Sequence, residues 1–150
     1  MTAPCDIVVT EDYSAADRDA VQRVLQTYNE SQGWPANMKP LGILLRDPAT
    51  GETIGGLWGR SAYDWLLIEY LVIPEALRGQ DIGTDLIRRA EAIAIARGCL
   101  GIWLTTLVFQ ARGFYEKLGF EAFATMEDSP RGGQRFFMRK RFAGADISSR

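Results

Sequence analysis

The stretch RGQDIG, residues 78–83, contains the residue types that bind a phosphate group. An apolar run and Pro74 precede it, and an amphipathic stretch that predicts a helix follows it. Turn residues directly before a helix present main-chain N–H groups without partners inside the helix, and the helix dipole adds a positive potential. Glycine allows an anion to approach closely. The stretch matches neither the three-glycine dinucleotide fingerprint nor the Gly-Lys-Ser/Thr ending of a P-loop.

Asp81 places a negative charge between the two glycines of this stretch. Aspartate tolerates a positive φ, so it can hold the turn. Two unit charges ~4 Å apart repel by roughly 4 kcal/mol at an effective dielectric of 20. Phosphate binding therefore requires the Asp81 carboxylate to point away, onto the helix N–H groups or toward Arg78. The alternative is a capping turn that binds nothing.

Proton transfer has two candidate side chains, Tyr115 and Glu69. The chain contains no histidine, which removes histidine-based triads, histidine zinc ligands and the commonest general base. Tyr115 could give a proton as a general acid, or only pack a helix onto the sheet. Glu69 lies within the apolar run WLLIEYLVI, where it could act as a base with a raised pKa, or be a structural acid paired with Arg or Lys.

The composition limits the class of protein. A chain of 150 residues with 47% apolar and 24% charged residues fits one globular domain. Its net charge of −2 gives no general attraction to nucleic acid or anionic membranes, and WLLIEYLVI is too short to span a bilayer. Cys5 and Cys99 form neither a disulfide framework nor a zinc cluster, so we expect a cytoplasmic protein, with Cys99 as an inert core thiol. Arg135, Arg139 and Arg141 alternate with apolar residues; this pattern could be a stripe that binds nucleic acid, but the net negative charge favours a solvated strand face.

The elements that must position these residues follow from the apolar periodicity. We expect a strand at 6–9, a helix after Ser14 with Asp17 completing a capping box, and a hairpin around DPATGE. A buried strand at 65–73, a helix from Thr84 to a C-cap at Gly98 and a second buried strand predict a right-handed crossover between parallel strands. A short helix and two final strands complete a mixed α/β sheet with helices on both faces. The domain is expected to cover residues 1–142, with 143–150 as a flexible tail.

The succession of apolar strand, RGQDIG, amphipathic helix, strand and FYEKLGF resembles the GNAT superfamily of acyl-CoA-dependent N-acyltransferases. Arg78 and Gly83 occupy the first and last positions of its arginine/glutamine-x-x-glycine-x-glycine/alanine loop, and residues 114–120 match its later helix. The resemblance runs from Ile7 to Phe142. The sequence departs from the family at Asp81, which usually is glycine, and at Val108, where many members have an asparagine that contacts the cofactor.

The resemblance implies a mostly antiparallel sheet of about seven strands with a splayed parallel pair at its centre. It also implies direct transfer of an acetyl group from acetyl-CoA to a primary amine, with no metal. Main-chain N–H groups of residues 71–73 would meet the pantetheine arm, one of them polarising the thioester carbonyl, and Tyr115 would be the general acid. Gln110 is the candidate substitute for the missing asparagine. The expected cofactor-binding residues are Leu71, Val72, Ile73, Arg78, Gly79, Gln80, Asp81, Ile82, Gly83, Thr84, Gln110 and Phe114.

The acceptor amine, a small molecule or a peptide, is expected near residues of the first helix, its following loop and the hairpin. These are Tyr28, Asn29, Trp34 and Trp58, each of which could instead be a core or covering residue. No nucleic acid or membrane partner is expected, and a homodimer is compatible with the fold. Two other interpretations stay open at this point: a catalytically inactive module that binds acyl-CoA for regulation, and a scaffold that binds no CoA.

Overall fold

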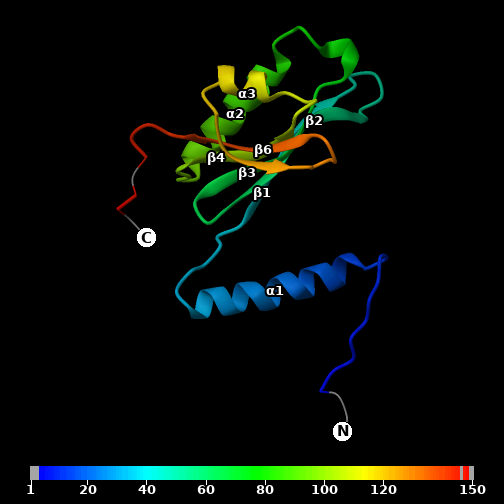
Figure 1. The fold of residues 1–150 in the computed structure, drawn as a ribbon, viewed down its shortest axis with the longest axis vertical. Helices are drawn as coiled ribbons and strands as arrows, with labels where there is room; N and C mark the ends of the chain where they lie inside the picture. Colours follow the sequence, from blue (N-terminus) through cyan, green and yellow to red (C-terminus); the bar gives the residue numbers. More distant parts are fainter. Residues whose placement is uncertain (1–3, 146, 149–150) are drawn as a thin grey trace. The chain divides into compact units, whose positions relative to one another are not determined.

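The computed structural model describes residues 4–145, 147 and 148. The chain divides into two compact units, Met1–Ala36 and Asn37–Arg150. The first contains helix α1, and the second contains the sheet with helices α2 and α3 (Figure 1). The predicted single domain over residues 1–142 stays a prediction, and the predicted tail lies partly outside the described residues.

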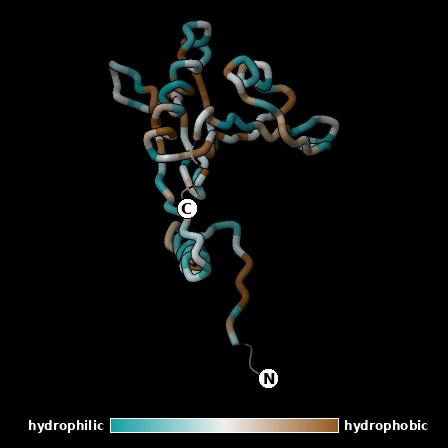
Figure 2. Tube along the Cα trace, turned by 90° about the vertical axis from the view of Figure 1, so that its left-hand side faces the viewer, coloured by the Kyte–Doolittle hydropathy of each residue, from teal (hydrophilic) through white to brown (hydrophobic). Residues whose placement is uncertain are grey.

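Helix α1, Ala15–Ser31, begins as the sequence predicts. The Asp17 main-chain N–H donates to Ser14 Oγ at 3.0 Å, and the Ser14 N–H donates to Asp17 Oδ2 at 3.4 Å, which completes the capping box. The predicted strand over residues 6–9 is wrong. These residues form an extended, exposed segment, seen in Figure 2 as the brown stretch nearest the N-terminus. A strand needs a partner for its N–H and C=O groups, and residues 4–36 contain no other strand.

The sheet of the second unit has six strands in the order β1-β2-β3-β4-β6-β5. All neighbouring strands are antiparallel except β3 and β4, which are parallel. This confirms the predicted mixed α/β class and its central parallel pair. The strands are β1 Lys39–Arg46, β2 Thr53–Ala62, β3 Trp65–Val72, β4 Gly101–Leu107, β5 Glu121–Glu127 and β6 Gln134–Arg141.

One face of the sheet is covered by α2, Ile82–Ala96, and α3, Arg112–Lys117. Helix α2 makes the crossover between β3 and β4, with a short 3₁₀ turn at Glu75–Leu77 before it. Its apolar stripe is buried because residues three and four apart lie on one side of a helix. Together with Tyr115 on α3, this stripe packs on alternate residues of the central strands; the buried side chains include Leu66, Ile68, Leu86, Ile87, Ala90, Ala94, Ile102 and Leu104.

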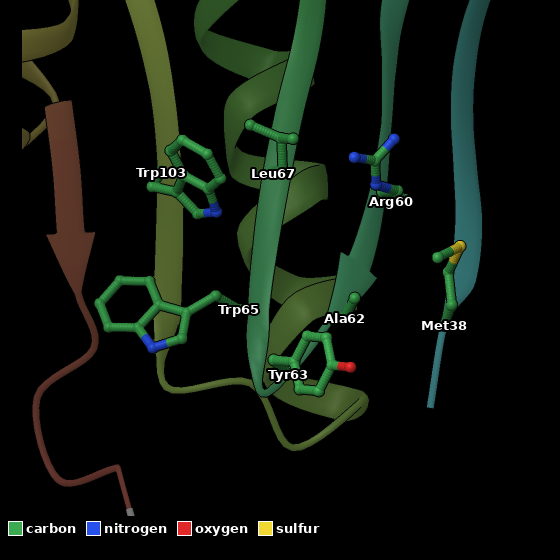
Figure 3. A pocket seen from close by; sticks show the side chains of 7 residues that line it. All are labelled: Met38, Arg60, Ala62, Tyr63, Trp65, Leu67 and Trp103. Atoms are coloured by element: carbon green, nitrogen blue, oxygen red, sulfur yellow. The ribbon is translucent and has the colours of Figure 1, made fainter. Parts of the chain in front are cut away.

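The opposite face of the same strands carries Trp65, Leu67 and Trp103, and we call it the open face (Figure 3). Their side chains project away from α2 because successive residues of a strand point to opposite sides. Within the second unit, strand β3 is deeply buried on its helix side. No helix in the described part of the chain is long and apolar enough to cross a membrane.

Candidate active site

Strands β3 and β4 separate partway along their length. They pair from Trp65 with Gly101 to Ile68 with Leu104, and beyond this point β3 has only β2 as a neighbour. On the β2 side, Gly59 pairs with Ile68 and Trp58 pairs with Tyr70, so Glu69 is an extra residue in a β-bulge. Bulges bend a strand and increase its twist. The bulge therefore lies where β3 turns away from β4, and the predicted splayed pair is formed.

The opening between the two strands is a cavity of about 220 Å³. The end of β3 forms one wall, the end of β4 the other, and the start of α3 closes it on the helix side. The lining residues are Ile68, Glu69, Tyr70, Leu71, Val72, Leu104, Thr105, Thr106, Gln110, Ala111 and Tyr115. The structure thus brings both predicted proton-transfer residues and three of the predicted cofactor-binding residues to one place.

Tyr115 contributes the most buried side chain with an ionisable group in this cavity. It is 7% exposed, and its ring packs edge-on against Phe114 at 5.2 Å and Phe120 at 5.7 Å between centroids. Burial raises the pKa of Tyr115 to about 12. Among the described residues none forms a hydrogen bond with its hydroxyl group. Tyr115 therefore combines a packing role with a protonated phenol that is available to a ligand in the cavity.

Glu69 lines the cavity but is not buried in apolar surroundings, so that premise of the base hypothesis is wrong. As the bulge residue it is exposed, and its Oε1 lies 2.5 Å from Arg60 Nη1 on β2. The two side chains are 27% and 38% exposed, respectively. The geometry contains one feature of each predicted alternative: Glu69 reaches the cavity, as a base would, and pairs with an arginine, as a structural acid would.

Gln110 lies in the turn between β4 and α3, where its side chain closes the end of the strand. Its Oε1 accepts a hydrogen bond from the Leu107 N–H at 2.7 Å and a second from Thr106 Oγ1 at 3.4 Å. Thr106 is 3% exposed, and its hydroxyl also accepts from the Ala111 N–H at 3.4 Å. With its carbonyl oxygen engaged, Gln110 can offer a cofactor only the N–H groups of its amide.

The RGQDIG loop presents unpartnered donors. None of the described residues accepts a hydrogen bond from the main-chain N–H groups of residues 79–84. The series is bounded on both sides, because the Arg78 N–H donates to Glu75 O at 3.2 Å and the Asp85 N–H donates to Asp81 O at 3.0 Å. Six consecutive free N–H groups at the start of a 15-residue helix form the site that an anion such as a diphosphate prefers.

Asp81 holds the turn in the left-handed conformation, which aspartate tolerates, with φ 59° and ψ 19°. Its side chain does not cap α2, and it has no hydrogen bond or ion pair to the rest of the described chain. The predicted hydrogen bond from the helix N–H groups to the carboxylate is therefore not formed, and the carboxylate makes no ion pair with Arg78. The residue is exposed, so water solvates the charge.

Arg78 and Gly83 attach the loop to its surroundings. Arg78 Nε donates to Ile73 O at 3.1 Å, so the side chain folds back over the end of β3. A Cβ added at Gly83 would lie 3.2 Å from Phe114 Cζ and 3.7 Å from Ile73 Cγ1. Glycine at this position therefore allows the start of α2 to approach α3 closely. Phe114 is partly buried and packs on the core, which gives this predicted cofactor contact a structural role as well.

The predicted acceptor residues are divided between the two units. Tyr28, Asn29 and Trp34 belong to residues 4–36, and Trp58 lies exposed on β2 opposite Tyr70, next to the bulge. None of the four lines the cavity as described for the second unit, so their role stays a prediction. Cys99 is buried, and this burial is the main reason why the pKa of its thiol is raised; Arg97 opposes the shift.

Sequence reasoning missed Thr105 and Thr106, which line the cavity, and Arg135, which holds one of them. Arg135 Nη1 donates to Thr105 Oγ1 at 2.9 Å across a sequence separation of 30 residues. Two adjacent threonines in a strand are ordinary in a sequence. Only the register between β4 and β6 shows that they stand at the opening.

Comparisons with known proteins agree with this geometry. Residues 8–120 match the acetyltransferase (GNAT) family. Acetyltransferase Atu2258 of Agrobacterium fabrum is 31% identical over 137 residues, which cover 91% of this chain and 99% of the relative. The chain therefore belongs to the GNAT acetyltransferase family, as the sequence predicts. Blasticidin-S acetyltransferase of Streptomyces morookaense is 41% identical over 83 residues, which cover 55% of this chain and 61% of the relative.

Solved structures show the same fold. An acetyltransferase from Bacillus cereus is 27% identical with a TM-score of 0.73, and the alignment covers 90% of this chain and 98% of that one. An aminoglycoside 6'-N-acetyltransferase complexed with coenzyme A has a TM-score of 0.61 at 17% identity, covering 91% of this chain and 86% of that one. At this identity the second likeness is one of fold alone.

Proposed function

We propose that the protein transfers an acetyl group from acetyl-CoA directly to the primary amine of a small-molecule or peptide acceptor. The observation that carries the proposal is the run of unpartnered N–H groups at residues 79–84, adjacent through Gly83 and Phe114 to the cavity that contains Tyr115. An acyl donor with a diphosphate and a thioester needs these two features in this order. Membership in an acetyltransferase family supports the same donor.

The residues that would bind acetyl-CoA would act mainly through their main chain. The N–H groups of residues 79–84 would bind the diphosphate, and the end of β3 at residues 71–73, which has no strand partner on the β4 side, would pair with the pantetheine arm. A main-chain N–H there would stabilise the negative oxygen that develops on the thioester carbonyl. Arg78, fixed to Ile73 O through Nε, would direct its remaining N–H groups toward a phosphate.

The reaction forms a C–N bond between the amine and the acetyl carbonyl carbon and breaks the C–S bond of the thioester. Tyr115 would donate its proton to the departing thiolate. Its raised pKa keeps the phenol protonated across neutral pH until the sulfur leaves. The amine must lose a proton in the same sequence, and Glu69 on the bulge would accept it, directly or through water.

Release of free thiol from acetyl-CoA, measured over a panel of primary amines, tests the proposal. We expect release that depends on both the amine and the enzyme, with the N-acetyl product identified by mass. Replacement of Glu69 by Gln should reduce kcat at least tenfold if the carboxylate is the base, and should leave kcat unchanged if the residue only pairs with Arg60.

The second candidate is an acyl-CoA-binding module without catalysis, which Asp81 and Val108 favour because both depart from the family pattern. Binding of acetyl-CoA without thiol release on any amine would support it. The free energy of unfolding, measured with and without CoA, separates the enzyme and the binding module from a scaffold that binds no CoA. A ligand at 100 times its dissociation constant stabilises the folded state by about 2.7 kcal/mol. The acceptor's identity, a homodimer and a cytoplasmic location stay predictions.

A further inference from the structure

Arg135 on β6 reaches from its strand to the wall of the cavity. Its Nη1 donates to Thr105 Oγ1 at 2.9 Å, and its Nε donates to Ser129 Oγ at 3.2 Å. Thr105 lines the cavity, and Arg135 is paired with Leu107 at the end of β4, where the opening lies. The guanidinium group is therefore anchored at the edge of the cavity on one side and to the turn before β6 on the other.

Arg135 lies on the open face, on the side of the cavity away from the diphosphate loop. Its neighbours along β6, Phe136 and Met138, are buried with the α2 and α3 side chains, so Arg135 and Arg139 project from the other face. Gly83 and Phe114, by contrast, lie on the helix side. Acetyl-CoA bound at the RGQDIG loop would thus approach the cavity from the helix side, and the acceptor amine would approach from the open face.

The charge of Arg135 is not compensated within the described part of the chain. Arg139, two residues on, pairs with Glu121 at 3.0 Å, whereas no described carboxylate pairs with Arg135. The nearest acids in sequence are engaged elsewhere: Glu127 accepts from Gln134 Nε2 at 2.9 Å, and Asp128 accepts from the Gly132 N–H at 3.1 Å. A guanidinium group has five N–H donors. The two hydroxyl contacts of Arg135 leave three of them free.

We propose that Arg135 binds a carboxylate of the acceptor, so that the acceptor is an amine that also carries an anionic group. The inference rests on the proposed acetyl transfer and adds a substrate class to it. A half-buried guanidinium group held in one orientation presents its free donors as a fork, and this fork matches a carboxylate. The two hydroxyl contacts reduce the freedom that the side chain would lose on binding, which favours a specific site over a solvated charge.

Product binding tests the substrate class without depending on turnover. N-acetylglycine, N-acetylleucine and N-acetylphenylalanine are compared with their carboxamides by calorimetry on the full chain. Acetylation converts the amine to an uncharged amide, so the two members of each pair differ only in whether the other end is a carboxylate or a carboxamide. We expect at least one acid to bind about tenfold more tightly than its amide, which is the range for a charge-assisted hydrogen-bonded pair. Equal binding of every pair would overturn the proposal.

Matched variants assign the preference to Arg135. R135Q should reduce the acid-to-amide preference to within twofold, and R135K should keep part of it. R139Q, the same change two residues along the same face, should keep all of it. An unchanged preference in R135Q would contradict the proposal. Failure of the proposed function is distinguishable, because thiol release would then be absent from the wild type on all amines, whereas failure of this inference alone would leave thiol release in the wild type together with equal binding of each acid and its amide.

Discussion

The two sides of the cavity are built from different chemical groups. On the helix side, the proposed diphosphate site consists of main-chain N–H groups from residues 79–84, with Gly83 allowing α2 to lie against Phe114. On the open face, the groups at the opening are side chains, Glu69 paired with Arg60 and Thr105 held by Arg135. The first side depends on backbone conformation, and the second on residue identity.

This difference indicates how one fold can combine a fixed acetyl donor with a variable amine acceptor. Main-chain donors survive most substitutions, because every residue except proline has an N–H group. A site of this kind changes only when the conformation of the turn changes. Side chains across four strands can be replaced one at a time without disturbing the helix side. We therefore expect substitutions on the helix side to affect donor binding and those on the open face to affect acceptor choice.

Replacement of Tyr115 by Phe should give the largest effect. The variant keeps the ring that packs between Phe114 and Phe120 and loses only the hydroxyl group. We expect kcat to fall at least 100-fold, the usual lower bound for a general acid, with little change in the dissociation constant of CoA. Steady-state kinetics and calorimetry measure the two quantities, and wild-type turnover in this variant would remove the general-acid assignment.

A bulky residue at Gly83 should disturb the packing of α2 against Phe114 of α3. A Cβ at Gly83 would stand 3.2 Å from Phe114, whereas one at Gly113 would meet no atom within 4 Å. We expect Gly83→Val to weaken CoA binding more than tenfold, because either the Phe114 ring or the start of α2 must move to make room for the side chain. Gly113→Val, also a helical glycine, is the control and should bind CoA as the wild type does. Equal affinities for CoA in the two variants would show that the close approach of α2 to α3 is not required.

The raised pKa of Tyr115 predicts a loss of stability at alkaline pH. Burial raises this pKa from 10 to about 12, so the contribution to stability is complete below pH 10 and is lost as the pH rises toward 12. By pH 11 the loss amounts to roughly 1 kcal/mol. Denaturant unfolding at pH 9 and pH 11 should show this difference between wild type and Tyr115→Phe. The same pH dependence in both proteins would contradict it.

The smallest expected effect concerns Asp81. Asp81 lies within the run of residues with free N–H groups, and its exposed carboxylate has no partner in the described part of the chain, so its charge should weaken binding of the diphosphate. Asp81→Asn keeps a residue that tolerates the left-handed conformation and removes the charge. We expect CoA affinity to rise about threefold at low ionic strength and less with added salt. Asp85→Asn is the control, because Asp85 already pairs with Arg89 at 3.0 Å.

The sequence was sufficient for the parts that depend on local patterns. The Ser14 capping box, the positive φ of Asp81 and the crossover from β3 to β4 all follow from short stretches of residues. The strand expected at residues 6–9 did not form, because a strand depends on a partner that local pattern cannot supply. The exposure of Glu69 was missed because it comes from a bulge, which interrupts the alternation on which the prediction was based.

The open-face side of the cavity was not predictable for a related reason. Thr105 and Arg135 meet only because β4 and β6 pair in one register, 30 residues apart in the chain. Register is set by the whole sheet and is not visible in the sequence around either residue. A side-chain site assembled across strands therefore becomes visible only in the folded sheet, whereas a turn before a helix can be recognised from six residues.

The central claim is that the N–H groups of residues 79–84 bind the diphosphate of the acetyl donor. Titration of the ¹⁵N-labelled protein with CoA, followed by amide NMR shifts, tests it directly. The largest shifts should fall on residues 79–84 with CoA and be absent with pantetheine, which lacks the diphosphate. CoA binding that leaves these six amides unshifted, or pantetheine that shifts them equally, would contradict the account.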